Sequence, residues 1–251
     1  MRIHSVPPFY IPGEVIGWEV LVQPEFKRRT RLANIKVDAA AVMAVGKPGV
    51  LDGKRVLIVR SRVKAGGVVA AMGGNVVQEF LTHISLENSG VSYRLFKSDM
   101  LGKSETVETK FFDDGYERIR RRRGRAYRRR IKLPAGEVAY DVQAILGVLR
   151  GWNPKLGTYA FFNALTENTY CRHTVRFTEK VSLRTRMGRA RAIRIDGNVR
   201  RLSRRLVVDA GDKGRPYTLW LSDDGERRPL RIAIQMKRAK VLFEIVSYKR
   251  P

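Results

Sequence analysis

The sequence predicts a mainly β protein, built as a single curved antiparallel sheet or open barrel of about ten strands around one short helix. Along most of the chain, apolar residues alternate with charged ones, which is the period of strands buried on one face. Several of these runs are separated by Asp-Gly pairs, which favour tight turns. Residues 137–150 instead follow a helical period.

The alternating runs predict the strands in chain order. The clearest are residues 54–63, 92–97, 181–187, 191–195, 217–222, 230–234 and 241–246. Asp-Gly tolerates the positive φ of tight hairpins, so each such pair between two runs predicts a turn. These pairs are Asp52-Gly53, Asp114-Gly115, Asp196-Gly197 and Asp224-Gly225.

The predicted helix covers about residues 137–150. Its apolar residues recur with a period of 3.6, and Gly151 follows Arg150, as helix C-termini prefer. Because the segment is short and apolar, we expect it to pack against the sheet or plug it. No Pro/Gly/Ser linker divides the chain. We therefore interpret residues 1–251 as one β-rich domain, with residues 1–12 as an extended N-terminal arm.

Charge is the strongest compositional feature. The 251 residues include 50 Lys and Arg against 24 Asp and Glu, a formal net charge of +26. This excess favours an anionic partner, such as nucleic acid, an acidic membrane surface or an acidic polysaccharide. The apolar fraction of 43% excludes a mainly disordered chain, and the single cysteine, Cys171, excludes an internal disulfide.

The sequence shows neither a membrane-spanning helix nor a signal peptide. The longest weakly polar stretch is residues 65–77, whereas a span needs about 20 apolar residues. Residues 1–8 lack the apolar segment of a leader. We therefore expect either a cytosolic protein or a mature form whose leader has been removed.

The most basic segment is a predicted hairpin. Ten of the 17 residues from Tyr116 to Lys132 are basic, and one, Glu117, is acidic. This predicts an edge that binds phosphate or lipid headgroups with steep salt dependence. The alternative is a solvated tip at Arg123-Gly124, whose arginines oppose aggregation of an edge strand. The candidate anion-binding residues are Arg118, Arg120, Arg121, Arg122, Arg123, Arg125, Arg128, Arg129 and Arg130.

A second basic zone runs from residue 184 to residue 205, with nine arginines and one acid. The arginines alternate with apolar residues, so we interpret the zone mainly as the solvated face of a hairpin. Its anion-binding candidates are Arg184, Arg186, Arg189 and Arg191. Neither zone has zinc-finger spacing, an RNP-like aromatic strand or aromatic residues interleaved with the arginines, which disfavours the common nucleic-acid-binding modules.

The sequence predicts no catalytic residue, no metal site and no cofactor. Cys171 and His173 would share one face of a strand, but no third group that would orient a nucleophile pair is evident. The three histidines are far apart, and metal sites draw clustered ligands. Asp223, Asp224 and Glu226 lie together beside a glycine, which is typical of a turn.

Two segments resemble a known bacterial family. Residues 140–150 combine an aspartate, an apolar helix and a closing Leu-Arg pair. Residues 219–231 begin Leu-Trp-Leu-Ser-Asp-Asp and end Arg-Arg-Pro-Leu-Arg. Both, in this order, are similar to segments of the bacterial domain-of-unknown-function family 3108, as are residues 12–14 and 53–67. The resemblance extends over about residues 13–248.

The resemblance implies an exported protein of Gram-negative bacteria, with an antiparallel sheet curled around a central helix, by analogy with the lipoprotein carriers of the periplasm. The family offers no catalytic residue to transfer. For the signature residues we expect structural roles: charges at the two helix ends, a tryptophan in the core, and acceptors in the following turn. These residues are Asp141, Arg150, Trp220, Ser222, Asp223 and Pro229.

We therefore predict a non-enzymatic binding or assembly protein of the bacterial envelope. Its partner would be anionic or amphiphilic, such as a lipid, an acylated protein or an acidic glycan, or it would be a protein subunit. The alternative is a cytosolic, basic structural protein that binds nucleic acid. A third hypothesis is a hydrolase, for which the sequence offers no paired general acid and base.

Overall fold

The computed structural model describes residues 8–24, 39–65, 76–100, 102–166, 169–203, 205–236 and 239–251. Within them, 14 strands form one sheet, in the order β8-β7-β6-β5-β4-β3-β2-β1-β14-β13-β12-β11-β10-β9. The first half comprises β1 (Val15–Pro24), β2 (Ala39–Leu51), β3 (Lys54–Ala65), β4 (Val76–Ser85), β5 (Val91–Met100), β6 (Lys103–Phe112), β7 (Gly115–Arg122) and β8 (Arg125–Lys132). The second half comprises β9 (Tyr159–Leu165), β10 (Tyr170–Thr185), β11 (Gly188–Arg201), β12 (Arg215–Ser222), β13 (Pro229–Gln235) and β14 (Ala239–Lys249).

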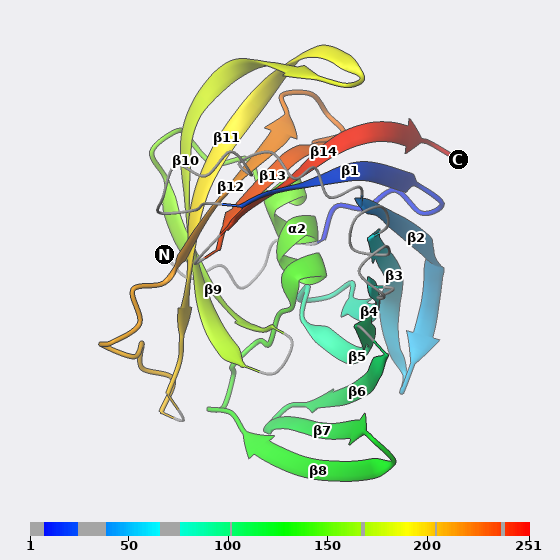
Figure 1. Cartoon of the computed structure of the whole chain (residues 1–251). Helices are drawn as coiled ribbons and strands as arrows, with labels where there is room; N and C mark the ends of the chain where they lie inside the picture. The colour runs from blue at the N-terminus through cyan, green and yellow to red at the C-terminus, as the bar shows by residue number, and fades with distance from the viewer. Residues whose placement is uncertain are drawn as a thin grey trace.

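The mainly β class and the single antiparallel sheet around a short helix are confirmed, but the predicted number of about ten strands is too low. Each half is a meander, and the pairing of β1 with β14 joins the halves. Figure 1 shows the sheet curled around α2 (Val142–Gly151), with β8 and β9 at its two ends. Because β8 and β9 do not pair, the barrel is open.

The two ends of the sheet approach each other at one place. Tyr116 of β7 and Ile131 of β8 belong to a small apolar cluster with Leu165 and Tyr170 of β9 and β10. The rings of Tyr116 and Tyr170 lie 6.2 Å apart. Side-chain packing, rather than strand pairing, therefore holds the curl closed at this point.

The helix starts five residues later than the predicted 137. Asp141 is its N-cap, and its carboxylate accepts the backbone N–H of Ala144 at 2.8 Å. Residues 137–141 instead follow a turn at residues 135–136 as an irregular segment, with an isolated bridge in which Tyr140 pairs with Ala164. The apolar face of the helix, including Val148 and Leu149, is buried in the main core inside the curl.

Asp196-Gly197, predicted as a turn, lies inside β11, so this prediction is wrong. Asp196 pairs with Thr218 of β12 and Gly197 with Tyr217, and a Cβ on Gly197 would lie 2.2 Å from Cζ of Tyr217. The glycine is needed for close packing of the ring, not for a positive φ. Asp52-Gly53 and Asp224-Gly225 do lie in turns.

Residues 1–7 of the predicted N-terminal arm lie outside the described residues. The rest of the arm lies against the helix: Phe9 donates its N–H to the carbonyl of Gly147 at 3.0 Å. Tyr10 is buried, and its hydroxyl donates to the carbonyl of Gln143 at 2.5 Å. In the described part of the chain, no helix has the length and apolarity that a membrane span requires.

Candidate functional site

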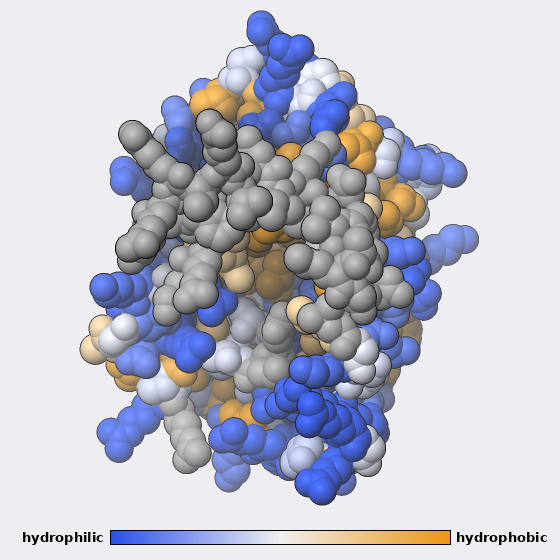
Figure 2. Space-filling view, in the orientation of Figure 1, coloured by the Kyte–Doolittle hydropathy of each residue, from blue (hydrophilic) through white to orange (hydrophobic). Residues whose placement is uncertain are grey.

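The curled sheet encloses a cavity of about 620 Å³ beside the start of α2. Phe80, Val142 and Val199 supply apolar lining, from β4, the helix and β11. Three cations also line the cavity: Arg94 of β5, Arg201 of β11 and Arg215 of β12. Figure 2 shows the hollowed face, with hydrophobic residues on its floor. Two carboxylates, Asp209 and Asp212, line the cavity as well, so its lining is a mixture of apolar and charged groups. A cavity of this volume with a few converging charged groups can hold a small molecule.

Arg94 is held rigidly at the base of the cavity. It is only 3% exposed, and its guanidinium donates to the carbonyl of Thr166 at 2.5 Å and lies 3.9 Å from the carboxylate of Asp141. It also lies over the ring of Phe80, 5.8 Å from the centroid. This charge is therefore already compensated within the fold.

Arg201 and Arg215 are different, because both side chains are exposed and neither has an ion-pair partner among the described residues. The nearby acid Asp212 accepts backbone N–H groups of Arg201 at 2.5 Å and Gly214 at 2.9 Å. These bonds lower the pKa of Asp212 below its ordinary value. The charge of Asp212 is thus stabilised mainly by backbone donors, with smaller contributions from the Arg201 and Arg200 charges. Within the part of the chain that the structure describes, neither Arg201 nor Arg215 is held in an ion pair at the cavity.

The strand register places part of the arginine hairpin on the concave face that continues from this cavity. Cross-strand neighbours run from Arg94 through Thr109 to Arg118 and then Arg129. On its other side, Arg94 pairs with Thr82 of β4, which donates to the helix cap Asp141 at 2.5 Å. The side chains of this row therefore point toward the helix, on the concave face of the sheet. By alternation, the concave arginines of β7 and β8 are Arg118, Arg120, Arg122, Arg125 and Arg129.

The arginines of the convex face are neutralised. Arg128 bonds to both carboxylate oxygens of Glu117 at 2.8 and 2.9 Å. Arg130 bonds to Asp114 at 3.1 Å. Arg121 lies 3.4 Å from Glu108. Each convex guanidinium of the hairpin therefore has a carboxylate in reach.

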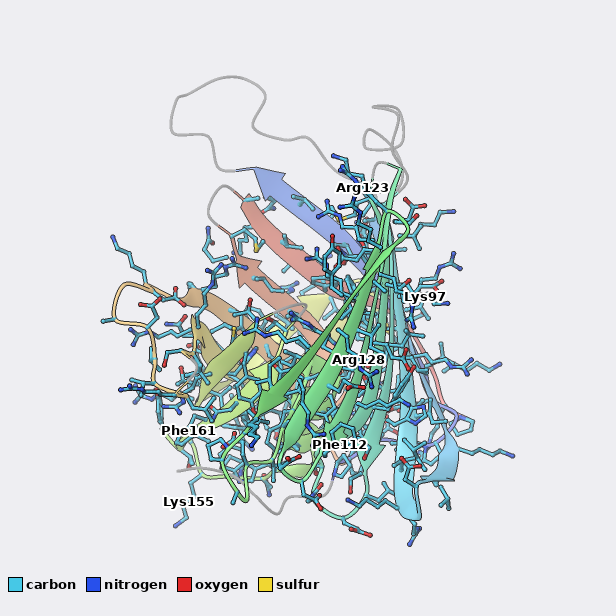
Figure 3. The ribbon with its side chains drawn as sticks, turned by 90° about the horizontal axis from the view of Figure 1, so that it is seen from below. Lys97, Phe112, Arg123, Arg128, Lys155 and Phe161 are labelled. Carbon is cyan, nitrogen blue, oxygen red and sulfur yellow. The ribbon has the colours of Figure 1, made fainter. Side chains whose placement is uncertain are left out.

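The concave face is less well compensated. Arg120 forms a bidentate pair with Glu105, at 2.6 and 2.9 Å. Arg122, Arg125 and Arg129 have no ion-pair partner among the described residues. Arg123 lies in the turn itself, with a φ of 51°. Figure 3 places Arg123 at the tip and Arg128 along the strand. Apart from Arg123 at the tip, the uncompensated positive charge of the hairpin thus faces the inside of the curl.

The four candidate arginines of the second basic zone lie away from the cavity, although Arg201 of the same zone lines it. Arg184 and Arg189 face each other across the end of the β10–β11 hairpin, and both are exposed. Arg186, in the turn, forms an ion pair of 2.9 Å with Glu19 of β1. Arg191 is exposed, and its carbonyl accepts the N–H of Asp223. The structure therefore does not bring the two sets of candidate arginines into one site.

The signature residues Asp141 and Arg150 sit at the helix ends, as expected, but each does more than complement the helix dipole. Asp141 caps the N-terminus and contacts Thr82 and Arg94. Arg150 is fully buried and bonds to Glu14 at 2.5 and 2.9 Å. Both residues therefore tie the helix to the surrounding sheet.

The remaining signature residues also have structural contacts. Trp220 is half-buried beside the main core, with Arg231 over its ring, rather than inside the core. Ser222 is an acceptor in the turn, as expected, and takes the N–H of Arg228 at 2.8 Å. Asp223 instead pairs with Lys180 at 3.0 Å. The carboxylate that accepts backbone N–H groups in this turn is that of Asp224. The Pro229 carbonyl accepts the indole N–H of Trp18 at 3.1 Å.

The Cys171 and His173 pair shows no nucleophilic activation. Burial raises the pKa of the Cys171 thiol and lowers the pKa of His173 to about 4. A reactive cysteine requires the opposite, a lowered thiol pKa beside a protonated imidazole. The ring of His173 instead lies edge-on to Tyr217, with centroids 5.9 Å apart.

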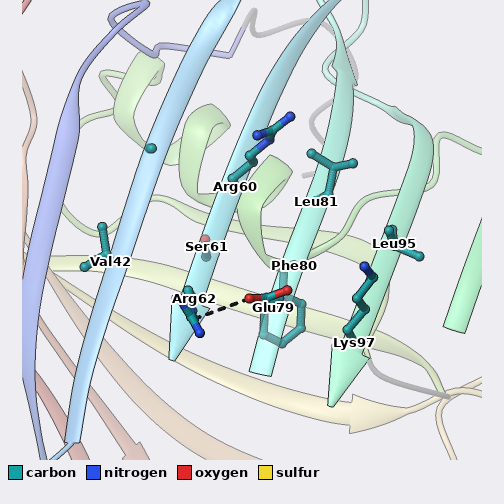
Figure 4. Close-up of a pocket in the computed structure, with 10 residues that line it drawn as sticks. Val42, Arg60, Ser61, Arg62, Glu79, Phe80, Leu81, Leu95 and Lys97 are labelled. Carbon is teal, nitrogen blue, oxygen red and sulfur yellow. Dashed lines mark ion pairs between the residues drawn. The ribbon is translucent and has the colours of Figure 1, made fainter. Parts of the chain in front are cut away.

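A second groove, of about 490 Å³, lies on the outer face of β2 to β5. Figure 4 shows Arg60, Leu81 and Leu95 on the side of these strands that faces away from the helix. An ion pair of 3.3 Å between Arg62 and Glu79 crosses the groove. This open face lacks the enclosure of the inner cavity.

Sequence reasoning missed Phe80, Arg94, Val142 and Arg215 as site residues, because the cavity is assembled from strands far apart in the chain. For the hairpin, by contrast, the sequence does hold a usable pattern. The tip at Arg123-Gly124 fixes the register of β7 and β8, so alternation from that tip divides the arginines into two sets, one on each face.

Comparison with known proteins gives a fold but no family. No family model and no curated protein matches the sequence, so membership of domain-of-unknown-function family 3108 is not confirmed. Among solved structures, the chain is similar to a β-barrel-like protein of domain of unknown function DUF1849 from Brucella abortus. The two share 10% identity over 96% of this chain and 100% of that one, with a TM-score of 0.58. This likeness shows the fold alone.

Two further structures score lower. A candidate exported protein with a YmcC-like fold from Bacteroides fragilis is 7% identical over 97% of this chain and 100% of that one, with a TM-score of 0.37. A candidate lipoprotein from Parabacteroides distasonis is 8% identical over 99% of this chain and 100% of that one, with a TM-score of 0.35. Scores of this size establish no common architecture.

Proposed function

We propose that the protein is a non-enzymatic binding protein that holds an anionic amphiphile inside its curled sheet. The observation that supports this most directly is the asymmetry of the arginine hairpin. Its convex arginines are paired with carboxylates, whereas Arg122, Arg125 and Arg129 face the concave side without such partners. An unpaired cation on the concave side of the curl, where less solvent screens its charge, attracts an anion more strongly than a paired one on the convex surface.

The cavity offers contacts to both the apolar part and the anionic part of such a ligand. Phe80, Val142 and Val199 would contact the apolar part of the ligand. Its anionic head would lie between Arg201 and Arg215 at the cavity and the concave arginines of the hairpin. Burial of apolar surface stabilises such a complex by roughly 25 cal/mol per Å². The anionic contacts would add specificity for acids over neutral analogues.

We also propose an envelope location in a bacterium, on the basis of the resemblance of residues 140–150 and 219–231 to an exported family. Cell fractionation of the native host tests it. Recovery of the protein in the periplasmic or membrane fraction supports the location, whereas recovery in the cytosol with bound nucleic acid favours the alternative function.

Ligand class is tested by titrating the full chain with a fluorescent anthroyloxy fatty acid, its methyl ester and a short labelled single-stranded DNA. We expect saturable one-to-one binding of the acid, with the neutral ester weaker by about ten-fold or more. Equal binding of acid and ester contradicts the role of the arginines. Tighter binding of the DNA, with a log–log salt slope of several units, favours the nucleic-acid alternative.

A further inference from the structure

The two edge strands of the sheet, β8 and β9, differ in how far other parts of the chain cover them. The edge of β9 is covered at one end, because the backbone of Tyr140 bonds to Asn163 and Leu165 at 3.2 and 2.8 Å. Five of the seven β9 residues are buried. By contrast, β8 pairs with β7 alone, and seven of its eight residues are exposed. One edge of the sheet is thus protected and the other is open.

The backbone of β8 offers unpaired hydrogen-bonding groups along this open edge. Its hairpin turns at Arg123 and Gly124, both with positive φ, so it is a two-residue turn whose flanking pair is Arg122 and Arg125. Bonded pairs then recur at every second residue. The N–H and C=O groups of Ala126, Arg128 and Arg130 therefore point away from β7, and none has a backbone partner among the described residues.

The side chains of β8 select what can pair with this edge. Five of its eight residues are basic, so a second copy of β8 would place arginine against arginine, which destabilises a strand pair. On the convex face, Arg128 and Arg130 are already neutralised by Glu117 and Asp114. On the concave face, Arg125 and Arg129 are not. The uncompensated charge therefore lies on one face, at two positions four residues apart, with Tyr127 between them.

We propose that β8 is a docking strand for an extended segment of a partner protein in which acidic residues occupy alternate positions. The segment would continue the sheet by backbone hydrogen bonds to Ala126, Arg128 and Arg130, with its carboxylates beside Arg125 and Arg129. Below this stretch, Ile131 packs in the cluster that includes Leu202 and Leu206. The open length is therefore residues 125–130, enough for a short strand.

This proposal does not depend on ligand binding in the cavity. It is tested with a labelled peptide that alternates Glu with Thr and Val, measured by fluorescence anisotropy on the full chain. A peptide of equal composition with its acids in one block serves as the control. We expect the alternating peptide to bind about ten-fold or more tightly than the block peptide.

Backbone methylation separates strand pairing from simple charge attraction. Two further peptides are N-methylated at every second residue, one in each phase. An edge strand accepts hydrogen bonds from only one phase, so we expect one methylated peptide to bind like the parent and the other to lose binding. Equal binding of both, or no binding of the parent at low salt, overturns the proposal.

Variants of the chain locate the docking strand. Ala126→Pro removes an edge N–H, whereas Ala126→Val keeps it, so we expect loss of peptide binding in the first and near-parent affinity in the second. Arg129→Glu should weaken the peptide by about ten-fold or more, and Arg128→Gln by about three-fold or less. Circular dichroism checks the fold, and fatty-acid binding by Ala126→Pro should be unchanged. If Ala126→Pro misfolds, the methylated peptides still test strand pairing, because they are measured on the parent chain.

Discussion

The guanidinium of Arg150 lies 2.5 and 2.9 Å from the two carboxylate oxygens of Glu14, and neither side chain is exposed to solvent. The pair joins the C-terminal end of α2 to the chain just before β1. Tyr248 of β14 donates its hydroxyl to the same carboxylate at 3.3 Å, and Arg150 also donates to the carbonyl of Glu226 at 3.1 Å. The helix inside the curl is therefore held by a buried polar junction as well as by apolar packing.

We expect Glu14→Gln to lower the free energy of unfolding by about 3 to 5 kcal/mol, because Arg150 is left as a buried, unpaired charge. The double variant Glu14→Leu/Arg150→Met should be milder than the single one, since it removes both charges. Urea denaturation measures all three proteins. The matched control is Asp113→Asn at the exposed Lys54 pair, which should cost about 0.5 kcal/mol or less. A Glu14→Gln effect as small as the control contradicts the junction.

Gly197 should be intolerant of a side chain. A Cβ there would lie 2.2 Å from Cζ of Tyr217, so Gly197→Ala must displace the ring, at a cost of about 1 to 3 kcal/mol in unfolding free energy. In a Tyr217→Leu background the same substitution should cost clearly less. Additive effects of the two substitutions in a double-mutant cycle would show that the ring is not the obstacle.

His173 should make stability depend on pH. Burial lowers its pKa from the ordinary value of 6.5 to about 4, so between these values the unfolded chain binds a proton that the folded chain does not. Stability from this group is complete above pH 6.5 and falls as the pH drops towards 4, by up to about 3 kcal/mol. His173→Phe should flatten the unfolding free energy in this window relative to the parent. An unchanged slope contradicts the buried, neutral imidazole.

Val142 lines the cavity mouth, and its substitution separates binding from folding. Val142→Glu adds a carboxylate to the first turn of α2, which has no acidic residue and favours one there. We therefore expect unchanged or slightly higher thermal stability, with fatty-acid affinity reduced by about ten-fold or more through charge repulsion. Val142→Leu is the apolar control and should keep the affinity. Peptide binding at β8 should be the same in both variants.

The sequence predicts the class of this fold and several of its strands because alternation survives wherever one face of a strand is buried. It misses β6, Lys103–Phe112, because residues 103–106 in its first half are polar on both faces. It also misses β2, where a bulge between Val45 and Pro48 admits a Gly-Lys-Pro-Gly segment that is typical of a loop. Asp196-Gly197 misleads for a related reason, because a packing glycine and a turn glycine look alike in sequence.

The cavity is beyond local sequence reasoning. Arg94 and Arg201 come from β5 and β11, which lie in opposite halves of the sheet, and only the curl brings them to one site. Net charge predicts an anionic partner but not a face. The hairpin register, together with the carboxylates of Glu117, Asp114 and Glu108, decides which arginines are compensated.

The central claim is that concave arginines bind the anion and convex ones do not. It is tested most directly by two variants that each remove two positive charges from the same hairpin. Arg122→Gln/Arg125→Gln alters the concave face, and Arg121→Gln/Arg128→Gln alters the convex face. At fixed ionic strength, the concave variant should bind the fluorescent fatty acid about ten-fold or more weakly, and the convex variant within about three-fold of the parent. Equal losses in the two variants would contradict the claim, because net charge alone would then explain binding.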